Sequence, residues 1–241
     1  MANKSIDILA FGAHPDDVEI SAGGTLAKHI ALGKTVALVD LTRGELGTRG
    51  TAETRDEEAR NAMKLMGVQE RINLDLGDGF FQHTQENLLK VVEMIRHFKP
   101  NLVLANAIED RHPDHAKGAK LVADACFLAG LPKIETRYNG EIQSAWRPKK
   151  VFHYIQDRYI KPDFAIEVSP FVEQKFDVLK CYKTQFYDPN SKEPQTPISG
   201  KEFFDFLESR MREFGREIGV EFAEGFTCSR ILGADDFEKI F

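Results

Sequence analysis

Short apolar runs alternate with longer amphipathic segments through the first half of the chain. The apolar runs predict buried strands at residues 6–13, 34–42, 71–77 and 101–107. Segments with apolar residues three and four positions apart predict helices at residues 17–33, 55–67, 85–98 and 116–130. Strands that alternate with helices of this length are typical of a mostly parallel sheet with helices on both faces.

The predicted fold class is α/β, with right-handed crossovers that wind these units into a Rossmann-like, doubly wound sheet. The second half is less regular and predicts strands at residues 151–156 and 164–169 and helices at residues 171–186 and 201–219. Residues 187–200, rich in Pro, Ser and Asn, read as a surface loop. Because no low-complexity linker separates the halves, we expect one domain over residues 1–241. In it, a core (1–130) precedes a C-terminal α/β extension (131–241) that completes the pocket.

Composition narrows the class of partner. The chain has 241 residues, 42% of them hydrophobic, with a net charge of -6 and no long block of like charge. This balance gives no sign of a nucleic-acid or membrane partner. The cysteines form no CxxC pair, which argues against a disulfide framework and a cysteine-based zinc site. Without a signal-like N-terminus or an apolar stretch of about 20 residues, we expect a cytoplasmic protein.

Two polar clusters follow the first and the fourth predicted strands. FGAHPDDVEI (residues 11–20) ends the first strand, and EDRHPDH (residues 109–115) follows the fourth. If these strands are neighbours, both clusters meet at the sheet edge where ligands bind. Helix capping and turn chemistry explain either cluster alone. Two clusters at equivalent strand ends favour a shared site made of His14, Asp16, Asp17, His112, Asp114 and His115.

Imidazoles and carboxylates together are typical of a catalytic metal site. Two histidines and a carboxylate leave open positions on Zn²⁺, and the same ligands suit non-haem Fe²⁺. His14 and Asp17 are three apart around a turn and can face one point, whereas Asp16 points elsewhere. One of His112 and His115 can bind the metal while the other stays free. A metal beside a free carboxylate predicts hydrolysis, because the carboxylate can accept a proton from water that the metal activates.

The motifs AHPDDVE and EDRHPDH resemble those of the LmbE-like (PIG-L) family of zinc-dependent N-acetylglucosamine deacetylases. The resemblance extends over essentially the whole chain, including TRGTAETRDEEA and EFAEGF. In length and in these segments the chain is similar to the bacillithiol-biosynthesis branch, which deacetylates N-acetylglucosaminyl malate. The resemblance implies a small-molecule sugar-conjugate substrate, a homo-oligomer, and one Zn²⁺ per chain, with Fe²⁺ or another divalent ion as the alternative.

The resemblance also implies individual roles. The zinc ligands would be His14, Asp17 and His115. Asp16 would be the general base, and His112 would stabilise the oxyanion or act as the acid, oriented by Asp114. Arg55 and Arg111 match positions that line the family's pocket, where a guanidinium suits a malate carboxylate. Arg55 can equally begin a charged helix.

Other positions have two interpretations. Glu19 either supports a metal ligand or is a charge in the first turn of a helix. Gly23 and Gly24 either let the helix lie close to the sheet or only kink it. A stripe of aromatic residues is expected to pack in the core or at a subunit interface and consists of Phe203, Phe206 and Phe214.

Two other functions would use the same residues differently. With Fe²⁺ the site would serve oxygen chemistry, although a free carboxylate beside a metal suits hydrolysis better. A nucleotide- or sugar-binding module is disfavoured because GAHPDD lacks the GxGxxG motif and places negative side chains where a phosphate would lie.

Overall fold

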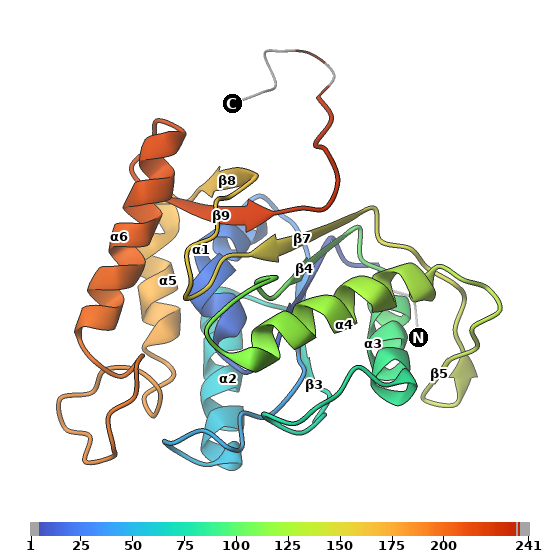
Figure 1. Cartoon of the computed structure of the whole chain (residues 1–241), viewed down its shortest axis with the longest axis horizontal. Helices are drawn as coiled ribbons and strands as arrows, with labels where there is room; N and C mark the ends of the chain where they lie inside the picture. Colours follow the sequence, from blue (N-terminus) through green and yellow to red (C-terminus); the bar gives the residue numbers. More distant parts are fainter. Residues whose placement is uncertain (1–4, 235, 237–241) are drawn as a thin grey trace.

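The computed structural model, shown in Figure 1, describes residues 5–234 and 236. A seven-stranded sheet has the order β3-β2-β1-β4-β7-β9-β8. The N-terminal half consists of β1 (Ile8–Gly12), α1 (Asp17–Ala31), β2 (Val36–Asp40), α2 (Ala52–Met66), β3 (Glu70–Asn73), α3 (Gln85–Phe98), β4 (Leu102–Ala105) and α4 (Pro113–Ala129). The pairs β1·β2, β1·β4, β2·β3 and β4·β7 are all parallel. The predicted Rossmann-like, mostly parallel sheet is therefore confirmed.

The C-terminal half continues the same sheet. Its elements are β5 (Arg137–Tyr138), β6 (Glu141–Ile142), β7 (Lys150–Tyr154), β8 (Phe164–Glu167), a 3-10 turn (Ser169–Phe171), α5 (Val172–Leu179), α6 (Glu202–Glu217) and β9 (Ala223–Thr227). Strand β9 pairs antiparallel with β7 and β8. Strand β9 was not predicted from the sequence, because its Glu224 and Gly225 have low strand propensity. The small β5-β6 hairpin was not predicted either.

Apolar cores cover both faces of the sheet. One core joins α1, α2, α5 and α6 to side chains such as Ile8 and Ala10 of β1. The other joins α3 and α4 to the alternate side chains Leu9 and Phe11. In Figure 1 the green helices α3 and α4 lie together, apart from the orange helices α5 and α6. Among the described residues, no helix has the length and apolarity needed to cross a membrane.

Two helices begin earlier than predicted. Helix α2 begins at Ala52 rather than at residue 55, because Thr51 and Thr54 form a reciprocal capping box. Helix α4 begins at Pro113 rather than at residue 116, with His112 as its N-cap. The second polar cluster is therefore held partly by the first turn of a helix.

Helix α5 ends earlier than predicted, at Leu179 rather than at residue 186. The chain then makes turns in which Tyr182 N–H donates to the carbonyl of Leu179, and Phe186 N–H to that of Tyr182. Both aromatic side chains are fully buried in the core. Burial of these rings therefore outweighs continuation of the helix.

Candidate metal centre and active site

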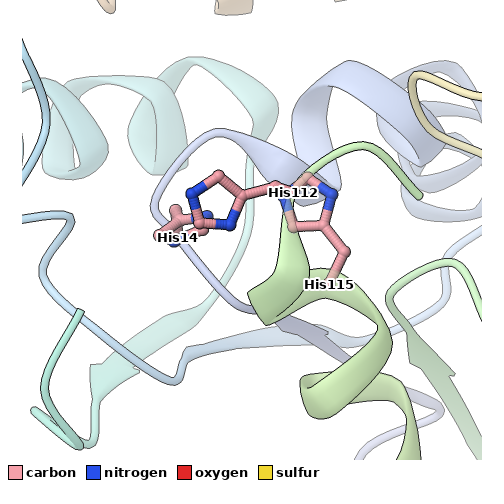
Figure 2. Close-up of side chains that lie close together, drawn as sticks. All are labelled: His14, His112 and His115. Atoms are coloured by element: carbon pink, nitrogen blue, oxygen red, sulfur yellow. The ribbon is translucent and has the colours of Figure 1, made fainter. Parts of the chain in front are cut away.

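The two polar clusters meet because β1 and β4 are adjacent parallel strands. Figure 2 shows His14, from the loop after β1, beside His112 and His115 at the start of α4. The ring centroid of His14 lies 4.5 Å from that of His112 and 5.5 Å from that of His115. The centroids of His112 and His115 are 5.3 Å apart. Three imidazoles therefore converge at the carboxyl edge of the sheet.

Asp17, the first residue of α1, lies between two of these histidines. Its Oδ1 is 3.2 Å from His115 Nε2, and its Oδ2 is 3.6 Å from His14 Nδ1. The side-chain amides of Asn106 and Gln156 donate to the same carboxylate at 2.9 and 3.0 Å. Burial opposes ionisation, but the contacts with His115 and His14 hold the pKa of Asp17 well below its ordinary value. Asp17 is therefore an ionised carboxylate.

The nitrogens of His14 and His115 that face away from Asp17 contact other carboxylates. His14 Nε2 lies 3.0 Å from Asp78 Oδ1, and His115 Nδ1 lies 2.5 Å from Asp110 Oδ2. Metal-bound histidines usually donate their second ring N–H to a carboxylate or carbonyl in this way. Despite burial, the nearby carboxylates raise the pKa of His115 to about 9 and that of His14 well above its usual range. The carboxylates around His14 and His115 therefore stabilise positive charge at this position.

These residues fit a divalent metal ion. In the part of the chain that the structure describes, two groups of three residues place ligand atoms within 4.8 Å of one another: His14, His112 and His115, and His14, Asp78 and Asp114. The set expected from the resemblance differs from both in using Asp17, which contacts both His14 and His115. Buried nitrogen and carboxylate ligands of this kind suit Zn²⁺ or Fe²⁺.

Asp16 has different partners from its neighbour Asp17. Its φ of 113° is unusual for a residue other than glycine and marks a strained backbone at this turn. Its Oδ2 lies 3.3 Å from Arg55 Nη2. Burial raises the pKa of Asp16 to about 7, although Arg55 acts in the opposite direction. A carboxyl group with this pKa can accept a proton near neutral pH.

Arg55 and Arg111, the two arginines expected to bind substrate, line the same cavity but are already paired. Arg55 is 4% exposed and also donates from Nη2 to the carbonyl of Pro15 at 2.6 Å. It therefore contacts the turn that carries Asp16. The side chain of Arg111 is 43% exposed, and its Nε donates to Asp157 Oδ2 at 2.7 Å. Of the two, Arg111 is the more accessible to a ligand.

His112 and Asp114 contact each other through the backbone of Asp114. The Asp114 carboxylate accepts from Gly79 N–H at 2.7 Å and from Lys117 Nζ at 3.0 Å, and lies 3.6 Å from His14 Nε2. Its backbone N–H, not its carboxylate, contacts His112, by donating to Nδ1 at 3.3 Å. This bond places the proton of a neutral His112 on Nε2. Burial lowers the pKa of His112, and the other two histidines lower it further, so the neutral form is favoured.

A cavity of about 290 Å³ opens next to these side chains. The loop of residues 43–51, called the rim loop below, contributes Gly44, Leu46, Gly47 and Thr48 to its wall. The C-terminal half contributes Gln156, Asp157, Gln185, Ile198, Phe206 and Leu207. The cavity is therefore lined by both polar and apolar side chains.

The two arginines of the rim loop, Arg43 and Arg49, hold the loop in place. Arg43 Nη2 donates to Asp56 Oδ2 at 2.7 Å. Arg49 is 4% exposed and contacts the segment that follows α5, through the Phe186 carbonyl at 3.4 Å, the Ser191 hydroxyl, and Glu193 Oε2 at 3.6 Å. Arg49 therefore joins the rim loop to the 187–200 loop.

The other residues with two interpretations have structural contacts of their own. Glu19 pairs with Arg71 Nη1 and accepts from the Tyr182 hydroxyl, each at 2.6 Å, so it supports an ion pair beneath α1. Gly24 lets α1 lie close to Val168, the residue that follows β8, since a Cβ at Gly24 would lie 2.9 Å from Val168 Cβ. In the aromatic stripe, Phe203 and Phe214 are buried, and Phe203 and Phe206 both line the cavity.

Asp78, Asp110, Asn106 and Gln156 are the site residues that the sequence analysis missed. Asp110 lies inside the quoted motif EDRHPDH, and Asn106 follows β4 directly. Asp78 lies between two glycines after the third strand, and this position was the available signal. Gln156 follows β7, which joins the sheet beside β4.

Comparison with known proteins supports a common origin for this arrangement. The model of the PIG-L family, described as GlcNAc-PI de-N-acetylase, matches residues 9–126. The diacetylchitobiose deacetylase of Thermococcus kodakarensis is 27% identical, over 90% of this chain and 81% of that protein. The uncharacterised deacetylase YaiS of Escherichia coli is 32% identical, over 72% of this chain and 93% of that protein.

A solved structure gives the same result over the whole fold. The conserved protein TT1542 from Thermus thermophilus superposes with a TM-score of 0.84 and 32% identity, over 95% of this chain and 98% of that one. The family match spans β1 to α4, the half that carries both polar clusters. With a relative 32% identical and almost wholly covered, the chain belongs to the PIG-L (LmbE-like) family.

Proposed function

We propose that this protein is a metal-dependent N-deacetylase that hydrolyses the acetamide of an N-acetylglucosamine conjugate to acetate and a free amine. One observation carries the proposal: adjacent aspartates with opposite surroundings. Asp17 contacts His14 and His115, whereas Asp16 pairs with Arg55 and has a pKa of about 7. A metal-binding carboxylate next to a free one suits hydrolysis. The deacetylases among the relatives support the same bond as the target.

His14, Asp17 and His115 would hold the ion, for which we propose Zn²⁺, one per chain, with Fe²⁺ as the alternative. The hydrogen bonds of Asn106 and Gln156 to Asp17 would keep its carboxylate in place. When bound, a divalent ion polarises a carbonyl oxygen and makes water a stronger acid.

Asp16 would be the general base. It would accept a proton from the water that attacks the acetamide carbon and return it to the nitrogen as the C–N bond breaks. A group that both takes and returns a proton works best with a pKa near the operating pH, and burial raises that of Asp16 to about 7. Arg55, which donates to Pro15 and pairs with Asp16, would hold the base in position.

His112 would stabilise the oxyanion that forms when water adds to the carbonyl. The bond from Asp114 N–H to its Nδ1 leaves the Nε2 proton available as a donor. Removing one oxyanion donor typically lowers kcat by about 100- to 1000-fold. By donating its backbone N–H to Nδ1, Asp114 would orient the His112 ring.

For the substrate we propose N-acetylglucosaminyl malate, converted to glucosaminyl malate in bacillithiol biosynthesis. Arg111 lines the cavity, and a guanidinium can bind a malate carboxylate with two hydrogen bonds. We also propose that residues 131–241 act with residues 1–130 as one unit, because Gln156 and Phe206 line the same cavity as His14.

The decisive experiment compares amine release from N-acetylglucosaminyl malate, free N-acetylglucosamine and the inositol conjugate. The protein is first stripped of metal with a chelator and then reloaded with Zn²⁺ or Fe²⁺. We expect the malate conjugate to react fastest and only after reloading. Equal, slow rates on all three substrates would refute the malate assignment. Full activity of the stripped protein would refute the metal-dependent mechanism itself.

A further inference from the structure

Asp78 connects a histidine of the metal centre to the wall of the cavity. Its Oδ1 lies 3.0 Å from His14 Nε2, and its Oδ2 accepts from the backbone N–H of Leu46 at 2.9 Å. Leu46 lies in the rim loop and lines the cavity. The Asp78 carboxylate therefore contacts both His14, a candidate metal ligand, and the rim loop, through Leu46.

Asp78 lies in a turn between two glycines that is hydrogen-bonded to the rim loop. Gly77 and Gly79 have φ values of 92° and 72°, which glycine adopts without strain. The N–H of Asp78 donates to Glu45 Oε1 at 2.7 Å, so the rim loop and this turn bond in both directions. The Asp78 residue is 7% exposed. Hydrogen bonds of both its backbone and its carboxylate therefore hold Asp78 in position.

The histidine partner of Asp78 has a matching arrangement on the other side of Asp17. His14 directs Nδ1 toward Asp17 and Nε2 toward Asp78 at 3.0 Å and, less closely, Asp114 at 3.6 Å. His115 directs Nε2 toward Asp17 and Nδ1 toward Asp110. In each ring the nitrogen that faces Asp17 could bind an ion, and a buried carboxylate contacts the other nitrogen. Such partners fix the orientation and tautomer of a metal-bound histidine, and their loss typically lowers metal affinity by about 10- to 100-fold.

We propose that Asp78 is a positioning residue that holds His14 for metal binding and at the same time fixes the rim loop over the cavity. This inference rests on the proposed function, because it requires His14 to bind the ion. Asp78 itself binds no ion in this scheme, since its two oxygens are engaged by His14 and by Leu46. Asp78 therefore positions both His14 and the rim loop in the wall of the cavity.

The test uses Asp78→Asn and Asp78→Ala in the full-length, zinc-loaded protein. Asparagine keeps the size of the side chain but has one acceptor oxygen, so it can serve His14 or Leu46 but not both. Alanine serves neither. Asp75→Asn is the matched control, because Asp75 is exposed and lies on the same connection after β3. Thermal unfolding of each variant checks that it folds, and Asp78→Asn carries the test if the alanine variant does not.

Two measurements read out the two roles. Competition with a chelator should show Zn²⁺ affinity lowered by about 10- to 100-fold in Asp78→Ala and unchanged in Asp75→Asn. Because asparagine can serve only one of the two partners, Asp78→Asn should show either this loss of affinity or faster hydrogen exchange at residues 43–51. Hydrogen exchange of the backbone amides at residues 43–51 should be faster in Asp78→Ala than in the wild type. Neither measurement depends on deacetylase activity.

The outcomes separate this inference from the proposed function. Zn²⁺ affinity within twofold of the wild type in both Asp78 variants would overturn the positioning role alone. Complete loss of ion binding in Asp78→Asn would make Asp78 a ligand, which also overturns it. A wild-type protein that binds no divalent ion would overturn the proposed function and this inference together.

Discussion

Replacing Asp16 with asparagine tests the division of labour between the two adjacent aspartates. The side chains are nearly equal in size, and the asparagine oxygen can still accept from Arg55 Nη2, now 3.3 Å from Asp16 Oδ2. Asparagine also tolerates positive φ better than most residues, which suits the φ of 113° at this position. We therefore expect Asp16→Asn to fold and to keep its metal, because His14, Asp17 and His115 are unchanged.

The loss of turnover should be large. A positioned general base typically contributes about 100- to 10,000-fold to the rate, or about 2.7 to 5.4 kcal/mol of activation free energy. The amide of asparagine cannot accept the proton of the attacking water. We expect kcat to fall by a factor within this range. KM should change little, because Asp16 acts on the attacking water, and the ion-pair partner of Asp16 is Arg55.

The assay is amine release by the zinc-loaded variant, with the metal content measured by elemental analysis. Asp177→Asn is the control, because this exposed carboxylate pairs with Lys180 after α5, does not line the cavity, and its loss should leave kcat unchanged. If Asp16→Asn keeps more than a tenth of the wild-type kcat at equal metal content, another group is the base. If it loses the metal, Asp16 belongs among the ligands.

Three further predictions test the metal centre and the packing. His115→Ala should lose bound metal after dialysis, and an unchanged zinc content by elemental analysis would contradict its assignment as a ligand. Gly24→Ala should lower the free energy of unfolding by about 1–3 kcal/mol through overpacking, because the new Cβ would lie 2.9 Å from Val168 Cβ. Gly23→Ala should lower it less in the same denaturant titration, because the nearest atom there, Lys175 Cγ, would lie 3.3 Å away. Burial raises the pKa of Cys126 to about 12, so this thiol should stay unreacted in the folded protein at pH 8, and its labelling there by a thiol reagent would contradict that burial.

The meeting of the two clusters could be predicted from the sequence because it depends on periodicity and strand order. Apolar runs separated by helical segments predict parallel strands, and the polar clusters at residues 11–20 and 109–115 follow two strands that are adjacent in the sheet. The start of α4 could not be predicted as well. Pro113 after a histidine reads as a turn, whereas here it occupies the first turn of a helix that His112 caps.

The supporting residues of the site depend on tertiary contacts that no local pattern encodes. Asp78 contacts a histidine 64 positions away in the sequence. Arg55 has the spacing of a surface residue on a charged helix, yet it is 4% exposed and contacts the turn at Asp16. The partners of the Asp114 carboxylate, Gly79 and Lys117, also lie outside the motif.

The pair of aspartates in AHPDD explains why both are needed. Asp16 lies in a left-handed turn and Asp17 begins α1, so consecutive residues direct their carboxylates to different partners. Burial acts on both, yet the pKa of Asp16 rises to about 7 while the contacts with His115 and His14 hold that of Asp17 well below its usual value. Two carboxyl groups whose surroundings move their pKa values apart are suited to different tasks. Asp17 can bind a cation as a permanent anion, and Asp16 can exchange a proton. The strained turn at Asp16 supplies that difference, which is why we assign the base to Asp16 and the metal to Asp17.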